Sequence, residues 1–233
     1  TRLQGDWSSD VCSSDLGLVI HPAAIGRCRE TRRVHLANHP MCTSLYRPNE
    51  ELMREFNNLE VAYLRDISEV ETRSLDELAE EGCFGRVDFI KIDIQGAELD
   101  AFQGATKALR STLGIVTEVE FSPIYEDQPL FGDVDRELRS RGFIFHKFIG
   151  LTGRCLRPVV VNNDPGMSTW HMWSDAMYLK HPCGWPELEP EALARLAILG
   201  LLYNSADVCF RCLHLYDEKL STQLAATMLE LGS

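Results

Sequence analysis

The clearest change in the pattern of apolar and polar positions falls at residues 87–102. A short β-branched apolar run there predicts a buried parallel strand. The run consists of Val87, Phe89, Ile90, Ile92 and Ile94. After Gln95-Gly96, apolar residues recur three and four positions apart, which predicts a helix over 98–110 that is closed by Gly114.

Polar residues interrupt this strand at its carboxyl end, where an apolar strand has no folding reason to carry them. They are Lys91, Asp93, Gln95 and Glu98. Gly96 permits a sharp turn from strand to helix and a close backbone approach. Ligands of open α/β sheets bind beyond the carboxyl ends of the strands. The pattern therefore predicts a ligand site here and favours an enzyme.

The pattern elsewhere predicts an α/β domain followed by helices. The expected elements are an edge strand at 31–36, a helix capped by Ser74 and Glu77, a strand at 115–121, a helix at 133–141, a strand at 143–148 and its antiparallel partner at 175–180. The strands at 87–94 and 115–121 are expected to be adjacent and parallel, which would place Asp93 and Glu118 or Glu120 in one concave pocket. The aromatic-containing loop at 150–174 is expected to shape a substrate pocket. Residues 183–233 are expected to form a helical extension, for packing or for homodimerisation.

Composition restricts the class of protein. A length of 233 residues is typical of one α/β domain with a small appendage. The net charge of −12 argues against a nucleic-acid partner, because neutralising phosphates requires a basic surface. No apolar run is long enough to span a bilayer, so we expect no membrane partner.

The eight cysteines have no disulfide framework spacing, which favours reduced thiols and a cytoplasmic protein. Cys209 and Cys212 have the spacing of a redox or zinc pair. Residues three apart on a helix also share a face, and no second ligand pair lies nearby. Helix packing is therefore the favoured interpretation of these two thiols.

Two segments carry a family resemblance: "DFIKIDIQGAELDAFQGA" and the later "GIVTEVEFSPIYEDQPLFGDVDRELRSRGF". They closely resemble FkbM-type S-adenosylmethionine-dependent methyltransferases, and the likeness extends over about 18–182. The resemblance implies a Rossmann-like sheet over 17–182 that is mostly parallel with an antiparallel last strand. It implies S-adenosyl-L-methionine as cofactor and O-methylation of a hydroxyl on a sugar, glycan or secondary metabolite.

The N-terminal residues 6–16 do not read as folded protein or as a secretory signal. Residues 6–16 resemble the conceptual translation of a common sequencing adapter, although a Ser/Asp-rich disordered terminus is an alternative. Residues 1–16 are therefore expected to be a non-native, unstructured leader. The family's glycine-rich cofactor turn has no counterpart in the sequence, so we expect a partial domain, with the first βαβα units missing, that does not bind the cofactor measurably.

The resemblance and the strand-end pattern together assign roles to individual residues. The catalytic candidates are Asp93, Glu98 and Glu120. The cofactor candidates are Ala24, Ile25, Gln95 and Gly96. The substrate-binding candidates are Lys91, Glu118, Tyr125 and His171. No spacing requires a metal, and none is predicted.

Structural alternatives stay open for several of these residues. Asp93 and Glu98 suit the beginning of a helix as caps or as dipole partners. His171 suits packing against its aromatic neighbours, and Ala24 and Ile25 suit the end of a strand. Two other functions also stay open: a nucleotide-dependent oxidoreductase, which needs a G-x-G-x-x-G turn, and a non-catalytic binding or assembly module.

Overall fold

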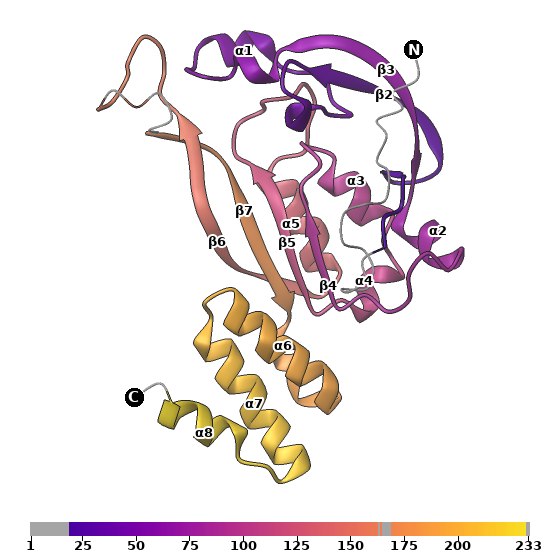
Figure 1. The fold of residues 1–233 in the computed structure, drawn as a ribbon, viewed down its shortest axis with the longest axis vertical. Coiled ribbons are helices and arrows are strands. Elements are labelled where there is room, and N and C mark those ends of the chain that lie inside the picture. The colour runs from indigo at the N-terminus through magenta and orange to yellow at the C-terminus, as the bar shows by residue number, and fades with distance from the viewer. Residues whose placement is uncertain (1–18, 163, 165–168, 232–233) are drawn as a thin grey trace.

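The computed structural model describes residues 19–162, 164 and 169–231. The predicted leader at 1–16 lies outside these residues. The described chain forms two sheets that share no strand. Figure 1 shows the smaller sheet, with β2 and β3, at one end of the molecule and the C-terminal helices at the other.

The smaller sheet has the strand order β1-β3-β2. Its elements and the short helices between β2 and β3 are β1 (Ala24–Ile25), β2 (Glu30–Ala37), η1 (Pro40–Cys42), α1 (Glu50–Arg54), η2 (Glu60–Ala62) and β3 (Leu64–Arg73). β2 pairs antiparallel with β3 and lies at an edge, which confirms the predicted edge strand.

The larger sheet has the strand order β4-β5-β7-β6. Its strands are β4 (Phe89–Ile92), β5 (Gly114–Glu120), β6 (Phe143–Arg154) and β7 (Trp170–Lys180). β4 and β5 are adjacent and parallel, as predicted. β7 pairs antiparallel with both of its neighbours, which confirms the antiparallel last strand.

The prediction that the sheet is mostly parallel was wrong for the described strands. Only two pairings are parallel, β1 with β3 and β4 with β5, whereas three are antiparallel. Antiparallel neighbours need only a connecting turn or loop, whereas parallel neighbours need a long crossover. The direct β6-to-β7 connection therefore gives a long antiparallel pair. The fold class is mixed α/β.

Four short helices lie next to the larger sheet. They are α2 (Leu75–Glu80), α3 (Glu98–Gln103), α4 (Ala108–Ser111) and α5 (Phe131–Ser140). Ser74 and Glu77 form the predicted capping box of α2. The prediction of a single helix over 98–110 was wrong, because the helix is interrupted after Gln103 and a second helix begins at Ala108. Gly114 begins β5 instead of closing a helix.

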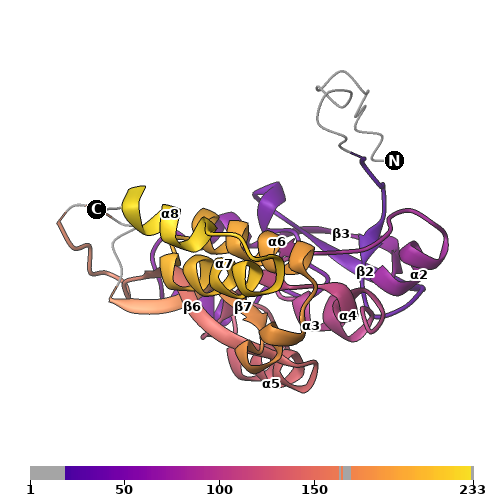
Figure 2. The same ribbon diagram turned by 90° about the horizontal axis from the view of Figure 1, so that it is seen from below.

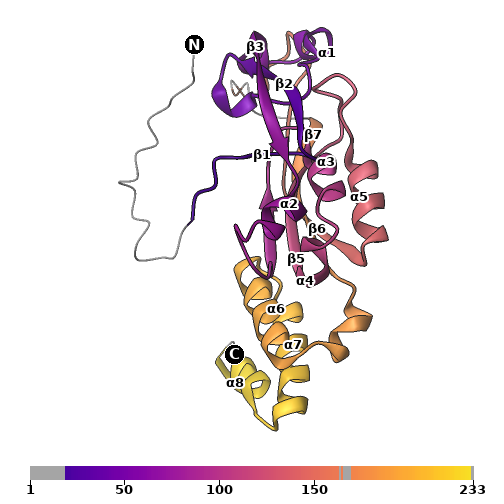
Figure 3. The ribbon, with the colours of Figure 1, turned by 90° about the vertical axis from the view of Figure 1, so that its right-hand side faces the viewer.

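Side chains of β5 alternate between two separate cores. Ile115 and Val119 pack with Phe102 and Leu138 of α3 and α5. Figure 3 shows these two helices on one side of the larger sheet. Val116 packs instead with residues of the C-terminal helices. The larger sheet is therefore covered by helices on both faces.

The C-terminal segment is helical, as predicted. It contains η3 (Pro182–Glu187), α6 (Pro190–Leu202), α7 (Ala206–Leu220) and α8 (Leu224–Leu231). Figure 2 shows α6 and α7 side by side. Cys209 and Cys212 are fully buried in the core that α6 and α7 share with the sheet, which confirms helix packing as their structural role. Among the described residues, no helix has the length and apolarity needed to cross a membrane.

The segment between β2 and β3 packs over the carboxyl ends of β4 and β5. A third core holds it there, composed of Met53, Phe56, Leu59, Ala62, Ile124, Tyr125 and Met172. Figure 1 shows α1 and the connections of the smaller sheet above these strand ends. The packing encloses the edge of the sheet where the sequence predicts a site.

Candidate functional site

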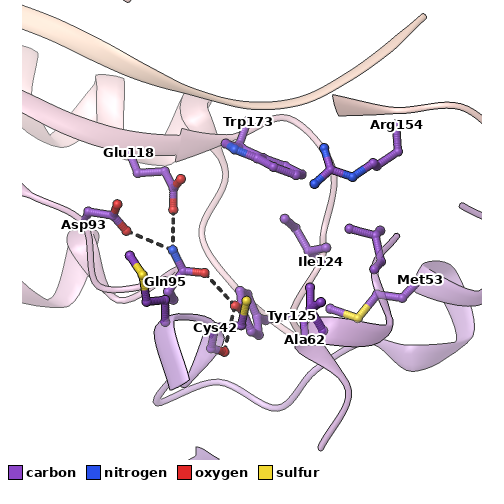
Figure 4. Close-up of a pocket in the computed structure, with 13 residues that line it drawn as sticks. Cys42, Met53, Ala62, Asp93, Gln95, Glu118, Ile124, Tyr125, Arg154 and Trp173 are labelled. Carbon is purple, nitrogen blue, oxygen red and sulfur yellow. Dashed lines mark hydrogen bonds between the residues drawn. The ribbon is translucent and has the colours of Figure 1, made fainter. Parts of the chain in front are cut away.

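A pocket of about 470 Å³ opens at the carboxyl ends of β4 and β5 (Figure 4). This volume falls in the usual range of small-molecule sites. Apolar side chains from the third core form much of its wall. The lining residues are Met41, Cys42, Met53, Leu59, Val61, Ala62, Asp93, Gln95, Glu118, Ile124, Tyr125, Arg154 and Trp173.

The Gln95 side chain connects the polar groups of this pocket. Its Nε2 donates hydrogen bonds to Asp93 Oδ1 at 2.9 Å and to Glu118 Oε2 at 2.8 Å. Its Oε1 lies 2.9 Å from the Tyr125 hydroxyl, which is also 3.1 Å from the Cys42 carbonyl oxygen. Figure 4 shows this network along one side of the pocket. The prediction that Asp93 and Glu118 share one concave site is confirmed.

The turn that presents Gln95 has a strained backbone. Gln95 has φ of 56° and Gly96 has φ of 95°, so two successive residues are left-handed. Glycine tolerates this conformation, whereas glutamine pays an energetic penalty for it. Ser44 Oγ donates a 2.6 Å hydrogen bond to the Gln95 carbonyl oxygen and fixes the turn. Strain that surrounding contacts hold in place is typical of functional sites.

Glu98 and Glu120 lie behind the pocket wall rather than in the lining. Each has only 2% of its surface exposed. Glu98 Oε1 accepts a 2.7 Å hydrogen bond from the Ile94 backbone N–H, so this carboxyl braces the strand-to-helix turn. The structure thus gives Glu98 a clear structural contact, and it places Asp93 and Glu118 closer to a ligand.

The site concentrates carboxyl groups in a poorly solvated region. Burial raises the pKa of Glu118 to about 8, and the negative charges of Asp93 and Glu98 add to the effect. Burial also raises the pKa values of Glu98 and Glu120. A carboxyl group with a pKa near neutrality can both accept and release a proton at physiological pH, as general acid–base chemistry requires.

Three of these carboxyl groups are close enough to consider as metal ligands. Single oxygen atoms of Asp93, Glu98 and Glu118 lie within 4.8 Å of one another. However, the Gln95 amide N–H group is directed at two of these residues, and a donor in that position competes with a cation. The Asp93 and Glu118 carboxyls share the Gln95 amide as their hydrogen-bond donor. We therefore assign no metal to this site.

Several other predicted residues lie outside this lining. Lys91 forms a 2.6 Å ion pair with Asp175 of β7. His171 lies exposed on β7. Ala24 and Ile25 form β1, which pairs with the end of β3 in the smaller sheet. The structure therefore does not bring these four residues together with Asp93, whereas Tyr125 does line the pocket.

Two contributors come from distant segments of the chain. Trp173, in the segment expected to shape the pocket, lines it from β7. Arg154, at the end of β6, was missed, because an arginine in an alternating strand carries no local signal. Its guanidinium carbon lies 4.9 Å from the centre of the Trp173 ring. The segment 43–48 also lies beside the site, through the hydrogen bond from Ser44 Oγ to the Gln95 carbonyl oxygen.

Comparison with known proteins gives two similarities. Residues 10–145 match the model of the methyltransferase FkbM domain. The match therefore includes residues 10–16 of the predicted leader, and it ends before the limit of about 182 that was expected for the family likeness. The 2-O-methyltransferase NoeI of Sinorhizobium fredii (strain NBRC 101917 / NGR234) is 41% identical over 59 residues, which are 25% of this chain and 24% of that protein. The chain thus matches about a quarter of the length of this curated relative. No solved structure matches.

Proposed function

The chain belongs to the FkbM methyltransferase family, and on this premise we propose that its strand-end pocket binds a hydroxyl-bearing acceptor for O-methylation. One observation carries the proposal. The Gln95 amide holds the Asp93 and Glu118 carboxyl groups together at the carboxyl ends of two parallel strands, inside a pocket of small-molecule size. Ligands of α/β sheets bind at this position.

The proposed acceptor class is a sugar, a glycan or a secondary metabolite that carries a free hydroxyl. The 2-O-methyltransferase name of the relative supports transfer to oxygen. The lining also supports it, because carboxyl and amide oxygens can accept hydrogen bonds from hydroxyls while the apolar wall packs against carbon.

Each polar residue has a distinct proposed role. Glu118, with a pKa of about 8, takes the proton of the acceptor hydroxyl. Asp93 accepts a hydrogen bond that orients the acceptor, and Gln95 keeps the two carboxyls at a fixed separation. When bound, S-adenosylmethionine supplies an electrophilic methyl group.

The described residues do not fit the whole of that cofactor. Backbone N–H groups of a glycine-rich turn bind cofactors closely in dinucleotide folds. Gly96 is the glycine beside the pocket, but its turn is occupied by Ser44 and by the Gln95 network. β1, with Ala24 and Ile25, pairs in the other sheet. We therefore propose that this chain binds the cofactor too weakly for calorimetry to measure, so that methyl transfer requires a high cofactor concentration.

Methyl transfer to a panel of hydroxyl acceptors tests this function. The protein is incubated with millimolar S-adenosylmethionine labelled with ¹³C in its methyl group, because low cofactor affinity is expected. Carbon NMR should then detect a labelled methyl ether. The Asp93→Asn variant should form the ether more slowly while its cofactor affinity stays unchanged. A label found on nitrogen or sulfur, or no transfer, would reject O-methylation by this chain.

A further inference from the structure

Arg154 is a partly buried cation without an acidic partner among the described residues. Its Nη1 donates a hydrogen bond to the adjacent Gly153 carbonyl oxygen at 2.6 Å, and its buried Nε has no hydrogen-bond partner. Burial lowers the pKa of Arg154, yet guanidinium groups keep their charge in proteins. An unpaired, desolvated charge is costly. The cost indicates that a ligand supplies the missing anion.

Other arginines of comparable burial in this fold are paired. Arg32 lies 3.2 Å from Asp100, and Arg141 lies 2.8 Å from Glu137. Arg73 pairs with Glu81. A carboxylate therefore balances the charge of each of these three arginines, although Arg73 Nε, like Arg154 Nε, has no hydrogen-bond partner. Arg154 is different because it has no such carboxylate among the described residues and lines the pocket, where its guanidinium lies over the Trp173 ring.

The pocket is consequently polarised. Figure 4 shows Asp93 and Glu118 at one end, and Arg154 beside Trp173 at the other. Figure 4 shows the apolar side chains of Met53, Ala62 and Ile124 on the side of the pocket below Trp173 and Arg154. A ligand that contacts all three groups has a hydroxyl near the carboxyls, carbon atoms against the apolar side chains and an oxyanion at Arg154.

We propose that the acceptor carries an oxyanion, as a phosphate, sulfate or carboxylate group, which Arg154 binds in a forked contact. The proposal rests on the proposed function, since it assigns the opposite end of the pocket to the reacting hydroxyl. Arginine's planar fork matches such groups bidentately. The bound oxyanion orients the acceptor so that its hydroxyl reaches Glu118, which makes Arg154 a specificity residue.

Nuclear magnetic resonance of the Arg154 Nε–H group tests the assignment without cofactor or turnover. Inorganic phosphate and glucose 6-phosphate should shift this signal to saturation, whereas glucose and matched sodium chloride should not. Arg154→Met should weaken glucose 6-phosphate binding roughly 10- to 100-fold, the usual loss for a charged hydrogen bond. Arg154→Lys should lose less. Arg65→Met, a change at an exposed arginine of β3, should lose nothing.

Three outcomes would overturn the proposal. The Arg154 signal would move no more with glucose 6-phosphate than with glucose, or Arg154→Met would bind the phosphate as tightly as the unchanged protein. Alternatively, S-adenosylhomocysteine would saturate the signal while glucose 6-phosphate did not, which would assign Arg154 to the cofactor carboxylate. Methyl transfer that persists in any of these cases leaves the proposed function intact. Conversely, phosphate binding without methyl transfer supports the Arg154 assignment alone.

Discussion

Gln95 connects the polar side chains of the candidate site through hydrogen bonds. The Gln95 side-chain amide forms hydrogen bonds with the Asp93 and Glu118 carboxyl groups and with the Tyr125 hydroxyl. The Gln95 backbone is left-handed, as is that of Gly96. Ser44 holds that backbone from the segment between β2 and β3. The residue thus links the larger sheet to the segment that covers it.

The raised pKa of Glu118 predicts a pH-dependent stability. The folded protein holds this proton up to about pH 8, whereas an ordinary glutamate releases it near 4.5. The folded state therefore loses stability as the pH rises from about 4.5 to about 8. Glu118→Gln keeps an acceptor for Gln95 and carries no charge. Between pH 5 and pH 8 the unchanged protein should lose about 3–4 kcal/mol of stability relative to Glu118→Gln, which has no proton to release at this position.

Urea unfolding at the two pH values measures this difference. The exposed change Glu51→Gln is a matched control, and its effect should be the same at both pH values. If Glu118→Gln also shows a constant difference, the folded protein does not hold the Glu118 proton near neutrality.

Residues near the strand end could be predicted from the sequence because their position is local. Asp93 and Gln95 come directly after one apolar strand, and Glu118 lies near the end of another. These two strands were expected to be parallel neighbours, as they are. Arg154 could not be predicted, since it reaches the pocket only through the pairing of β6 with β7. The covering role of Ala62 and Met53 likewise depends on tertiary packing.

At the scale of elements, the break between α3 and α4 shows how long-range contacts override a periodic pattern. The Asp76 carboxylate of α2 accepts hydrogen bonds from the backbone N–H groups of Lys107 and Ala108, which begins a new helix. The Asp76 backbone N–H donates to the Gly104 carbonyl oxygen at 3.1 Å. The apolar spacing over 98–110 is real, but it contains no information about this partner.

Gly104 predicts a specific sensitivity at this break. A Cβ added there would lie 2.6 Å from the Arg27 carbonyl oxygen and 2.7 Å from that of Gly26, and backbone atoms cannot easily move away. Gly104→Ala should therefore lower the free energy of unfolding by about 2–3 kcal/mol. Thermal and urea unfolding would measure the loss.

Gly132 in α5 is the matched control for this change. A Cβ there meets nothing within 4 Å. Gly132→Ala should raise stability by about 0.5–1 kcal/mol, because alanine favours a helix more than glycine does. If the two substitutions changed stability equally, the close approach of the Gly26 and Arg27 carbonyl oxygens to Gly104 would be contradicted.

At the scale of the whole molecule, the two sheet faces are covered differently. α3 and α5 cover one face, and α6 and α7 cover the other with a core of their own. Most of the predicted strands were confirmed, because apolar patterning defines them locally. Their division into two sheets was not predicted, because the spacing of apolar residues does not show that β1, β2 and β3 form a sheet of their own.

The outer surface of α6 offers a test of the homodimer that the sequence led us to expect. Ile198, Leu201 and Leu202 are each more than half exposed, at 55%, 55% and 69%. Contiguous exposed apolar side chains often mark interaction sites. Ile198→Glu combined with Leu202→Glu should shift the protein to monomers in sedimentation velocity. A monomeric unchanged protein would contradict the proposal.

In the proposed reaction, Glu118 accepts the proton of the hydroxyl that becomes methylated. The most direct test is the rate of methyl-ether formation from labelled S-adenosylmethionine as a function of pH, in the unchanged protein and in Glu118→Gln. We expect the rate to rise with pH through about 8, because Glu118 must lose its own proton before it can accept another. We also expect a loss of roughly 10²- to 10⁴-fold in kcat for Glu118→Gln, and no loss for Glu51→Gln. Equal rates for Glu118→Gln and the unchanged protein, or no ether from the unchanged protein, would contradict the proposed reaction.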